Sequence, residues 1–309
     1  MKFLGPVLAI LVFGTTAFAQ NKTAVEPPET SEAAAQLLFE NLDEDVLAAL
    51  GMDVEQAKKF VVELQKSFQG TYVYDLAALR ETAVQLLPVL EQSEESAPYA
   101  SWLKTHFDYF EVAEKLRKNA SRGATNAAKM LPAPSAIVER KAWVEVMEVR
   151  PIPPLAFKQV AQLKKIFVAE KVPPELVWIA EVESSFDTKA RSPAGAAGLF
   201  QLMPVTARSL DLSVGLLRDE RFHPEKNTRA AAHYLRQLYG RFGDWRLTLA
   251  AYNAGEGRVA NLLKKHRAKT FDAIANYLPS ETQMFVPKVE AVVRKREGRA
   301  LADLKMPRK

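Results

Sequence analysis

The sequence predicts a mainly helical, all-α protein, and three observations support this fold class. Apolar residues recur at spacings of three and four over residues 54–68 and again over 99–116, the spacing of one buried helix face. Asp53 can cap the first of these stretches and Gly70 can end it. Pro204 begins another segment, and proline is tolerated in a first helical turn.

Residues 1–19 have the pattern of a secretory signal peptide. One positive charge at Lys2 precedes a short apolar run over residues 3–13, and an Ala-Phe-Ala cleavage site precedes Gln20. The apolar run is too short to span a bilayer. We therefore expect cleavage before Gln20, no transmembrane helix in the mature chain, and a periplasmic location.

The composition restricts partners and cofactors. Because there is no cysteine, the sequence offers no disulfide, no thiolate zinc site and no cysteine for a lipid anchor. The formal charge of +5 and the pI near 9.2 favour an anionic wall polymer or membrane surface. No nucleic-acid partner is expected of an exported chain without a recognition motif. His106, His223 and His233 lack ligand spacing, so no metal or other cofactor is expected.

The mature chain is long for one hydrophobic core, which predicts two domains. The boundary is expected in a basic, proline-punctuated region. In chain order we predict a signal peptide over 1–19, a linker over 20–30, a helical N-terminal domain of unknown role over 31–135, a linker with a bridging helix over 136–153, a catalytic domain over 154–300 and a loose tail over 301–309.

Capping residues and prolines place further helices along the chain. We expect helices over 31–50, 75–87, 136–149 and 155–170, one that starts at Pro173 and Pro174, one capped by Asn227 and Thr228, one that follows Gly243 and Asp244, and a last one beyond Pro287. On the helix over 99–116, Tyr99, Trp102, Phe107 and Phe110 form an aromatic face. That face either packs into a core, which the spacing favours, or serves as a platform for sugar rings.

The segment 177–203 joins a buried helix to a small-residue loop. Apolar residues lead to Glu183, and the loop that follows contains Gly195 and Gly198. A carboxyl desolvated by apolar neighbours has a raised pKa and can donate a proton near neutral pH. Glu183 is therefore a candidate general acid. The alternative is a solvated glutamate at an exposed helix end.

Two separated blocks resemble the soluble lytic transglycosylase (SLT) family. Residues 183–207 carry an ES pair, a phenylalanine and the pattern SxxGAxGLxQxMPxTA, and residues 251–259 read AYNAGEGRV. Residues 278–288 look like the LPxET…YVPK segment of the membrane-bound transglycosylase D branch. Some members of the family are lipoproteins, and this sequence departs from them because it has no cysteine for a lipid anchor. The resemblance covers about residues 173–292.

The resemblance implies a domain similar to goose-type lysozyme that acts on the glycan strands of peptidoglycan. It implies cleavage of the β-1,4 bond between N-acetylmuramic acid and N-acetylglucosamine to give 1,6-anhydromuramic acid, with Glu183 acting as acid and then as base. Carried over from the family as supporting or substrate-binding residues are Ser184, Ser192, Gly198, Gln201, Met203, Tyr252 and Asn253.

Two of these residues also have a chemical rationale. The Gln201 amide can donate to and accept from sugar substituents, and the Tyr252 phenol can hydrogen-bond the catalytic carboxyl. Tyr252 can equally be a buried tyrosine bonded to the backbone.

The presence or absence of a second carboxyl beside Glu183 distinguishes a hydrolase from a transglycosylase. Glu181 lies two residues before Glu183, on nearly the opposite helix face, and Asp187 is interpreted as a structural loop residue. A hydrolysing glycosidase normally needs two carboxyls. Glu256 is the best remaining candidate for the second one and keeps a hydrolysing muramidase as the alternative, beside a catalytically silent peptidoglycan-binding protein.

Overall fold

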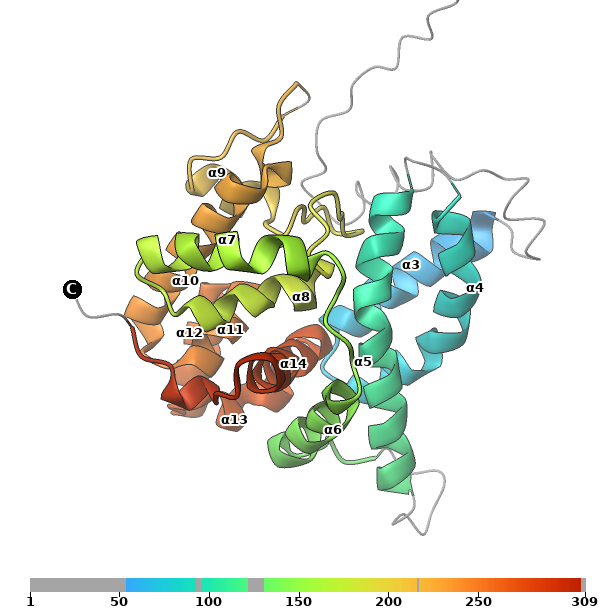
Figure 1. The fold of residues 1–309 in the computed structure, drawn as a ribbon. Coiled ribbons are helices and arrows are strands. Elements are labelled where there is room, and N and C mark those ends of the chain that lie inside the picture. The colour runs from blue at the N-terminus through green and yellow to red at the C-terminus, as the bar shows by residue number, and fades with distance from the viewer. Residues whose placement is uncertain (1–53, 93–95, 122–130, 216, 307–309) are drawn as a thin grey trace, which may run out of the picture.

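The computed structural model describes residues 54–92, 96–121, 131–215 and 217–306. Within these ranges every regular element is a helix, and the only β pairing consists of isolated bridges, so the all-α prediction is confirmed (Figure 1). The signal peptide, the linker over 20–30 and the helix predicted over 31–50 lie outside the described residues.

Helices of the N-terminal part form the group at the right of Figure 1. They are α3 (Val54–Gln69), the 3-10 helix η1 (Val73–Leu79), α4 (Arg80–Leu90) and α5 (Ala97–Ser121). The helix predicted over 75–87 is thus two elements. In η1, Val73, Leu76 and Leu79 are all buried, because residues three apart eclipse one another in a 3-10 helix.

The aromatic face of α5 packs around Phe68 of α3. The Phe68 ring lies 6.1 Å from Trp102, 5.4 Å from His106, 6.0 Å from Tyr109 and 6.3 Å from Phe110 between centroids. Burying such rings supplies much of the packing energy of a small helical unit. The aromatic face is therefore mainly part of a core, which is the interpretation that the spacing favoured.

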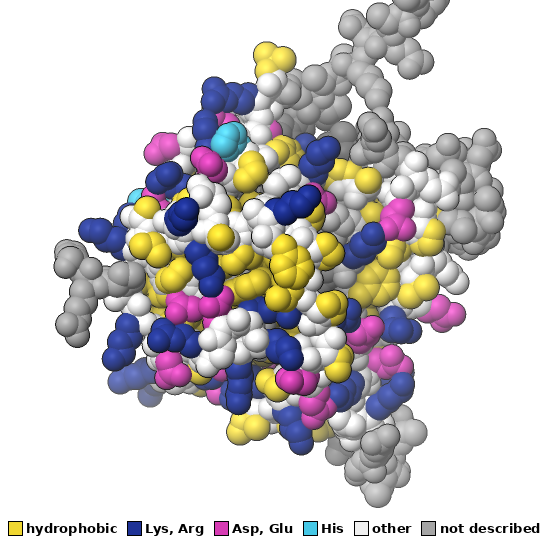
Figure 2. All heavy atoms as spheres, in the orientation of Figure 1, with side chains coloured by type: hydrophobic (Ala, Val, Ile, Leu, Met, Phe, Trp, Pro, Cys, Tyr) yellow, Lys and Arg dark blue, Asp and Glu magenta, His cyan; other side chains and the backbone are white. Residues whose placement is uncertain are grey.

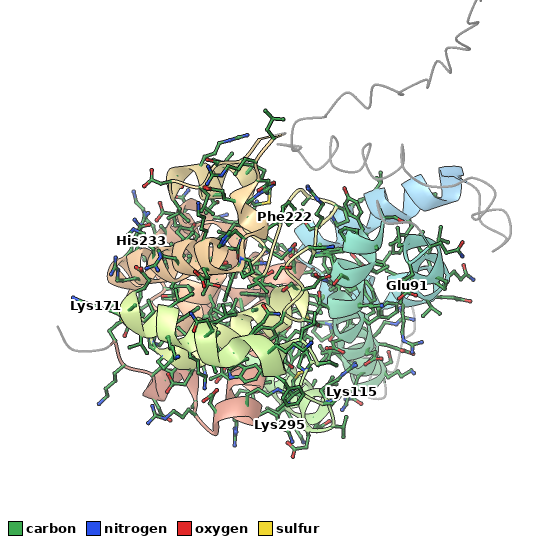
Figure 3. All side chains as sticks on the ribbon, turned by 45° about the horizontal axis from the view of Figure 1, so that its top comes forward. Glu91, Lys115, Lys171, Phe222, His233 and Lys295 are labelled. Atoms are coloured by element: carbon green, nitrogen blue, oxygen red, sulfur yellow. The ribbon has the colours of Figure 1, made fainter. Side chains whose placement is uncertain are left out.

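Helix α6 (Ala136–Glu148) contacts both α5 and the last long helix. The Ser135 hydroxyl caps it by accepting from the Val138 amide. Lys115 of α5 pairs with Glu145, and Lys295 of the last long helix pairs with Glu148 at 3.2 Å (Figure 3). Helix α6 therefore contacts both parts of the molecule.

The remaining elements build the second part of the molecule. In chain order they are α7 (Ala156–Ala169), η2 (Pro174–Trp178), α8 (Ile179–Ser184), α9 (Pro204–Ser209), η3 (Glu220–Phe222), α10 (Pro224–Phe242), α11 (Trp245–Ala254), α12 (Glu256–His266), α13 (Phe271–Ile274), η4 (Ala275–Tyr277), α14 (Ser280–Glu297) and η5 (Leu301–Asp303).

Helix α14 is largely buried and corrects one prediction. It begins at Ser280, so Pro287 lies inside the helix and not before it. The lost backbone donor at Pro287 is offset by packing, since nearly every residue of the helix from Thr282 to Val289 is buried. Helix α14 contacts α3, η1, α6, α8 and α11, which places it at the junction of both parts.

The hydrophobic core is continuous across the predicted domain boundary. Buried side chains from Phe60 to Leu304 form one connected cluster. Polar bonds also cross the junction, from the Ser280 amide to the Gly70 carbonyl at 2.6 Å and from the Gln283 amide group to the Thr71 carbonyl at 2.9 Å. The N-terminal helices are thus packed firmly against α14.

The tail predicted as loose over 301–309 is docked in its first part. Leu301 and Leu304 are buried, and the Trp245 indole donates to the Leu304 carbonyl at 2.9 Å. The apolar residues of the tail provide the reason, because leaving them in water costs more than ordering a short segment. Residues 307–309 lie outside the described residues.

The surface shows no single dominant charge patch on the face in Figure 2. Basic and acidic side chains alternate there with hydrophobic ones, so the net charge of +5 is dispersed on this face. In the described part of the chain, no helix combines the length and apolar character that a membrane span requires.

Candidate active site

Glu183 stands at the end of α8, where the chain reverses direction. Pro174 occupies the first turn of η2, which leads directly into α8. Ser185 and Phe186 then adopt left-handed conformations with φ of 50° and 65°, and their amides bond back to Glu181 and Ala180. This C-terminal cap, locked by the fully buried Phe186 ring, fixes Glu183 one residue before the helix ends.

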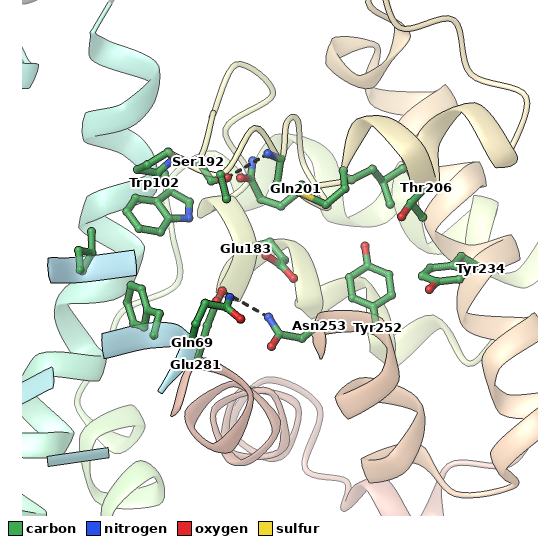
Figure 4. A pocket seen from close by; sticks show the side chains of 17 residues that line it. Gln69, Trp102, Glu183, Ser192, Gln201, Thr206, Tyr234, Tyr252, Asn253 and Glu281 are labelled. Atoms are coloured by element: carbon green, nitrogen blue, oxygen red, sulfur yellow. Dashed lines mark hydrogen bonds between the residues drawn. The ribbon is translucent and has the colours of Figure 1, made fainter. Parts of the chain in front are cut away.

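A pocket of about 310 Å³ opens beside Glu183 (Figure 4). Its walls come from the loop over 192–206, from α10, α11 and α14, and from the N-terminal helices α3 and α5. The side chains that line it include Leu64, Phe68, Gln69, Trp102, Glu183, Ser192, Gln201, Met203, Thr206, Tyr234, Tyr252, Asn253 and Glu281. The predicted residues Glu183, Ser192, Gln201, Met203, Tyr252 and Asn253 therefore meet in one cavity.

The Glu183 carboxyl faces the pocket and forms no hydrogen bond with a described residue. Burial raises its pKa well above the ordinary value, the charge of Glu281 raises it further, and the ammonium of Lys288 opposes these effects. A carboxyl whose pKa is raised in this way keeps its proton to higher pH than a solvated one and can act as a proton donor. The solvated helix-end alternative does not describe this side chain.

Glu281 is a second carboxyl in the same pocket, which the sequence analysis missed. It lies in the first turn of α14 and accepts a 3.4 Å hydrogen bond from the Asn253 amide. Burial raises the pKa of Glu281, and the bond from Asn253 opposes that rise by favouring the charged form. The signal that points to it is the LPSET block, in which this acidic residue follows directly on a proline-serine helix start.

Asn253 forms hydrogen bonds with two residues of α14, Glu281 and Thr282. Its amide nitrogen faces Glu281, and its amide oxygen accepts a 2.6 Å hydrogen bond from the Thr282 hydroxyl. The two bonds fix which end of the amide faces the acid. Asn253 therefore orients Glu281 rather than Glu183.

Tyr252 lies beside Glu183 but does not hydrogen-bond it. Its hydroxyl donates to the Phe200 carbonyl at 2.6 Å, and its ring packs 5.6 Å from the ring of Tyr234. Burial raises the pKa of Tyr252 well above the ordinary value, and the neighbouring Glu183 raises it further. The backbone-bonded alternative is the one that the structure favours.

Gln201 lines the pocket and has one unpaired acceptor. Its backbone has a φ of 45°, and its amide nitrogen donates to the Ala190 and Gly198 carbonyls at 3.0 and 2.9 Å. Its amide oxygen is buried and has no hydrogen-bond partner in the described structure. A buried acceptor left open in a pocket costs free energy until a ligand donor pairs with it.

The loop that carries Gln201 folds tightly against its own backbone. Gly198 has a φ of 81°, and a β-carbon there would lie 2.0 Å from the Arg221 carbonyl oxygen. The Ser192 hydroxyl accepts from the Ala196 amide at 2.9 Å. Gly198 is thus needed for close backbone approach, and it does not line the pocket.

Three buried side chains stabilise this loop through hydrogen bonds to its backbone. The Ser184 hydroxyl donates to the Leu199 carbonyl at 2.8 Å, and Arg221 donates to the Gly195 and Leu202 carbonyls at 2.8 and 3.1 Å. Asn227 accepts from the Phe200 amide at 2.9 Å. Ser184 is therefore structural, buried away from the pocket.

The same geometry corrects the capping role predicted for Asn227 and Thr228. Helix α10 begins at Pro224, so both residues lie inside it and are fully buried. Their polar groups are satisfied by the loop and by the Pro224 carbonyl rather than by a helix start.

The other candidate carboxylates lie outside the pocket. Glu181 forms a bidentate ion pair with Arg296, at 2.7 and 3.0 Å, and Asp187 accepts from the Lys189 amide in a turn. Glu256 is half exposed and pairs with Arg241 at 2.8 Å. Glu256 is therefore not the second carboxyl of this site, and Glu281 takes that place.

In the described residues, no three side chains of histidine, cysteine, aspartate or glutamate are grouped to hold a metal ion. His233 contacts Arg236 and Gln237 on α10, on the outside of the molecule (Figure 3).

Comparisons with known proteins find similarity in the part of the chain that carries Glu183. Residues 164–275 match the transglycosylase SLT domain. Membrane-bound lytic murein transglycosylase D of Escherichia coli K12 is 42% identical over 134 residues, which are 42% of this chain and 29% of that protein. Soluble lytic murein transglycosylase of the same strain is 36% identical over 151 residues, 45% of this chain and 22% of that protein.

A solved structure of the lytic transglycosylase Slt of Pseudomonas aeruginosa aligns with 85% of this chain and 48% of that one, at 23% identity and a TM-score of 0.40, too low for an inference. The chain spans less than a third of the two Escherichia coli relatives that it matches. The matched segment contains Glu183, Gln201, Tyr252 and Asn253. Residues 164–275 of this chain are a transglycosylase SLT domain.

Proposed function

We propose that this protein is a peptidoglycan lytic transglycosylase with Glu183 as its catalytic acid and base. The observation that carries the proposal is a pocket-facing carboxyl whose pKa is raised by burial, located within a transglycosylase SLT domain. Two relatives of this domain are named lytic murein transglycosylases, which supports the same reaction and the same polymer here.

In the proposed reaction, protonated Glu183 donates to the oxygen of the β-1,4 bond between N-acetylmuramic acid and N-acetylglucosamine. The carboxylate then removes the proton from the muramoyl 6-hydroxyl, which closes onto C1 and gives the 1,6-anhydro sugar. One carboxyl returns to its starting state at the end of the cycle. Ring closure is intramolecular, so a firmly held sugar supplies the effective concentration that a bimolecular reaction with water lacks.

Neighbouring residues have positioning roles in this scheme. The open Gln201 oxygen accepts from a hydroxyl or acetamido donor of a bound sugar, and the Tyr252 phenol holds the loop at Phe200. Ser192 and Met203 form part of the same wall.

A hydrolysing muramidase is the second candidate, and Glu281 is the observation that favours it. Two carboxyls with different environments share the pocket, as in enzymes where one donates a proton and the other activates water. A catalytically silent peptidoglycan-binding protein fits less well, because a site that only binds does not need a pocket-facing carboxyl with a raised pKa.

We further propose that the enzyme acts in the periplasm, on the basis of the signal-peptide pattern of residues 1–19. Its partner there is the glycan strand of peptidoglycan.

Incubation of the purified mature protein with peptidoglycan sacculi tests the proposed function. The wild type should release soluble muropeptides, and Glu183→Gln, which keeps the shape of the side chain but has no acidic proton, should release none. Glu256→Gln serves as a matched control outside the pocket and should retain activity. Equal release by Glu183→Gln and the wild type would remove Glu183 from the mechanism.

A further inference from the structure

The N-terminal helices supply one wall of the pocket that contains Glu183. Leu64, Phe68 and Gln69 reach it from α3, and Trp102 reaches it from α5 (Figure 4). All four lie outside residues 164–275, the segment that matches the SLT domain. This wall, here called the α3/α5 wall, therefore belongs to the part of the chain for which the sequence gives no role.

The chemistry of the α3/α5 wall is that of a sugar site. Leu64 and Phe68 present carbon atoms, and the Trp102 indole adds an aromatic edge that is 7% exposed. The C–H faces of a sugar ring and the methyl of an acetamido group pack on such surfaces. Phe68 and Trp102 support each other in an edge-to-face contact, so the wall is rigid before any ligand arrives.

Polar groups for sugar substituents stand on the same wall. Gln69 is exposed at the end of α3 and lines the pocket with both amide functions open. The Trp102 indole nitrogen donates to none of the described residues. A mostly apolar pocket with a few such convergent polar groups is the usual form of a small-ligand site.

The α3/α5 wall is fixed to the same helix that carries Glu281. Directly after α3, the Gly70 carbonyl accepts from the Ser280 amide and hydroxyl, at 2.6 and 3.0 Å. On α5, the Thr105 carbonyl accepts from the Lys288 ammonium, which also lies 4.7 Å from the Tyr109 ring centre. The wall and the carboxyl pair therefore hold a defined relative position.

We propose that the α3/α5 wall is a sugar-binding subsite: it binds an acetamido-sugar ring of the glycan close to the glycosidic bond that is cleaved at Glu183. The proposal rests on the proposed function and assigns a task to the N-terminal helices. In it, Gln69 and Trp102 determine affinity for the glycan strand and take no part in proton transfer. The expected signature is a change in KM without an equal change in kcat.

The test uses two variants of the full chain. Gln69→Ala removes an exposed amide, and Trp102→Phe keeps an aromatic ring but removes the indole N–H. Each should raise KM on sacculi and Kd for a tetramer of N-acetylglucosamine, which has no peptide stem, by about five-fold, the effect of one lost hydrogen bond. Gln85→Ala, an exposed glutamine on α4 that does not line the pocket, is the matched control and should match the wild type.

Each outcome decides one proposal. Wild-type KM and Kd in Gln69→Ala and Trp102→Phe, with an active wild type, would overturn the subsite. A raised KM with unchanged tetramer binding, or no tetramer binding by the wild type, would overturn the sugar assignment and point to a peptide stem. A wild type that binds the tetramer through Gln69 but releases nothing from sacculi would overturn the proposed function and leave the subsite standing.

Discussion

The carboxyl groups of Glu183 and Glu281 face one pocket from two different helices, and the charge of Glu281 raises the pKa of Glu183. Asn253 donates to Glu281 and so favours its charged form. The two carboxyls thus have different surroundings within one pocket, which is the pattern of sites that perform acid and base chemistry at one pH.

Replacing Glu281 with glutamine should lower the pKa of Glu183, because a neighbouring negative charge disfavours ionisation. A general acid is active only while protonated, so the alkaline limb of the kcat/KM profile should move to lower pH. The profile measured on soluble glycan strands checks this. In Glu256→Gln, the control whose replaced carboxyl lies outside the pocket, the alkaline limb should stay at the wild-type pH. An alkaline limb at the wild-type pH in Glu281→Gln would contradict the effect of Glu281 on the pKa of Glu183.

Tyr252→Phe should leave the alkaline limb unchanged, because the phenol donates to the Phe200 carbonyl and not to Glu183. The cost should instead be about 1 kcal/mol in the free energy of unfolding, that of one lost hydrogen bond. Urea unfolding and the pH profile of the same variant measure the two effects separately. A shifted limb at wild-type stability would show that Tyr252 bonds the acid directly.

Gly198→Ala should destabilise the fold strongly. The left-handed conformation costs a β-carbon about 1–2 kcal/mol, and the 2.0 Å approach to the Arg221 oxygen adds roughly 1–3 kcal/mol of overpacking. Gly243→Ala separates the two effects, since its φ is 65° but no atom lies within 4 Å of the added carbon. It should lose only about 1–2 kcal/mol. If urea unfolding gives the same loss of unfolding free energy for both variants, the loop around Gly198 must shift to make room for the added carbon.

Glu139 should make the fold less stable as pH rises. Its side chain is 1% exposed, one carboxyl oxygen has no hydrogen-bond partner in the described structure, and burial raises its pKa from 4.5 to about 8. Between these values the unfolded state binds fewer protons, so stability is complete below pH 4.5 and falls until about pH 8.

Glu139→Gln removes this titration, and its stability relative to the wild type should rise across that pH range by up to about 5 kcal/mol. Urea unfolding at several pH values measures how the difference in unfolding free energy between variant and wild type changes with pH. Glu148→Gln, an exposed position on the same helix, should show no such trend. A pH-independent difference for Glu139→Gln would mean that Glu139 reaches water.

The sequence predicted the helical fold and much of the pocket because both depend on local patterns. Helix α3 follows apolar spacing with a glycine stop, and Glu183 with its loop is a continuous motif. Helix α14 was placed too late because proline normally stops a helix; burial on all sides outweighs that preference at Pro287.

Residues brought together only by tertiary packing were beyond such reasoning. Glu281 and Trp102 reach the pocket from segments that are distant in the sequence. The spacing of apolar residues along a helix shows which face is buried, but it does not show whether a side chain on that face lines a cavity or packs into a core. Asn227 has the composition of a cap, and only the fold reveals that it braces the Phe200 amide.

The most direct test of the account is mass spectrometry of the products that the mature protein releases from sacculi, with Glu183→Gln beside it. We predict muropeptides that end in 1,6-anhydromuramic acid and their loss in the variant. Products heavier by one water, with reducing ends, would contradict a single-acid transglycosylase and identify Glu281 as the partner that activates water.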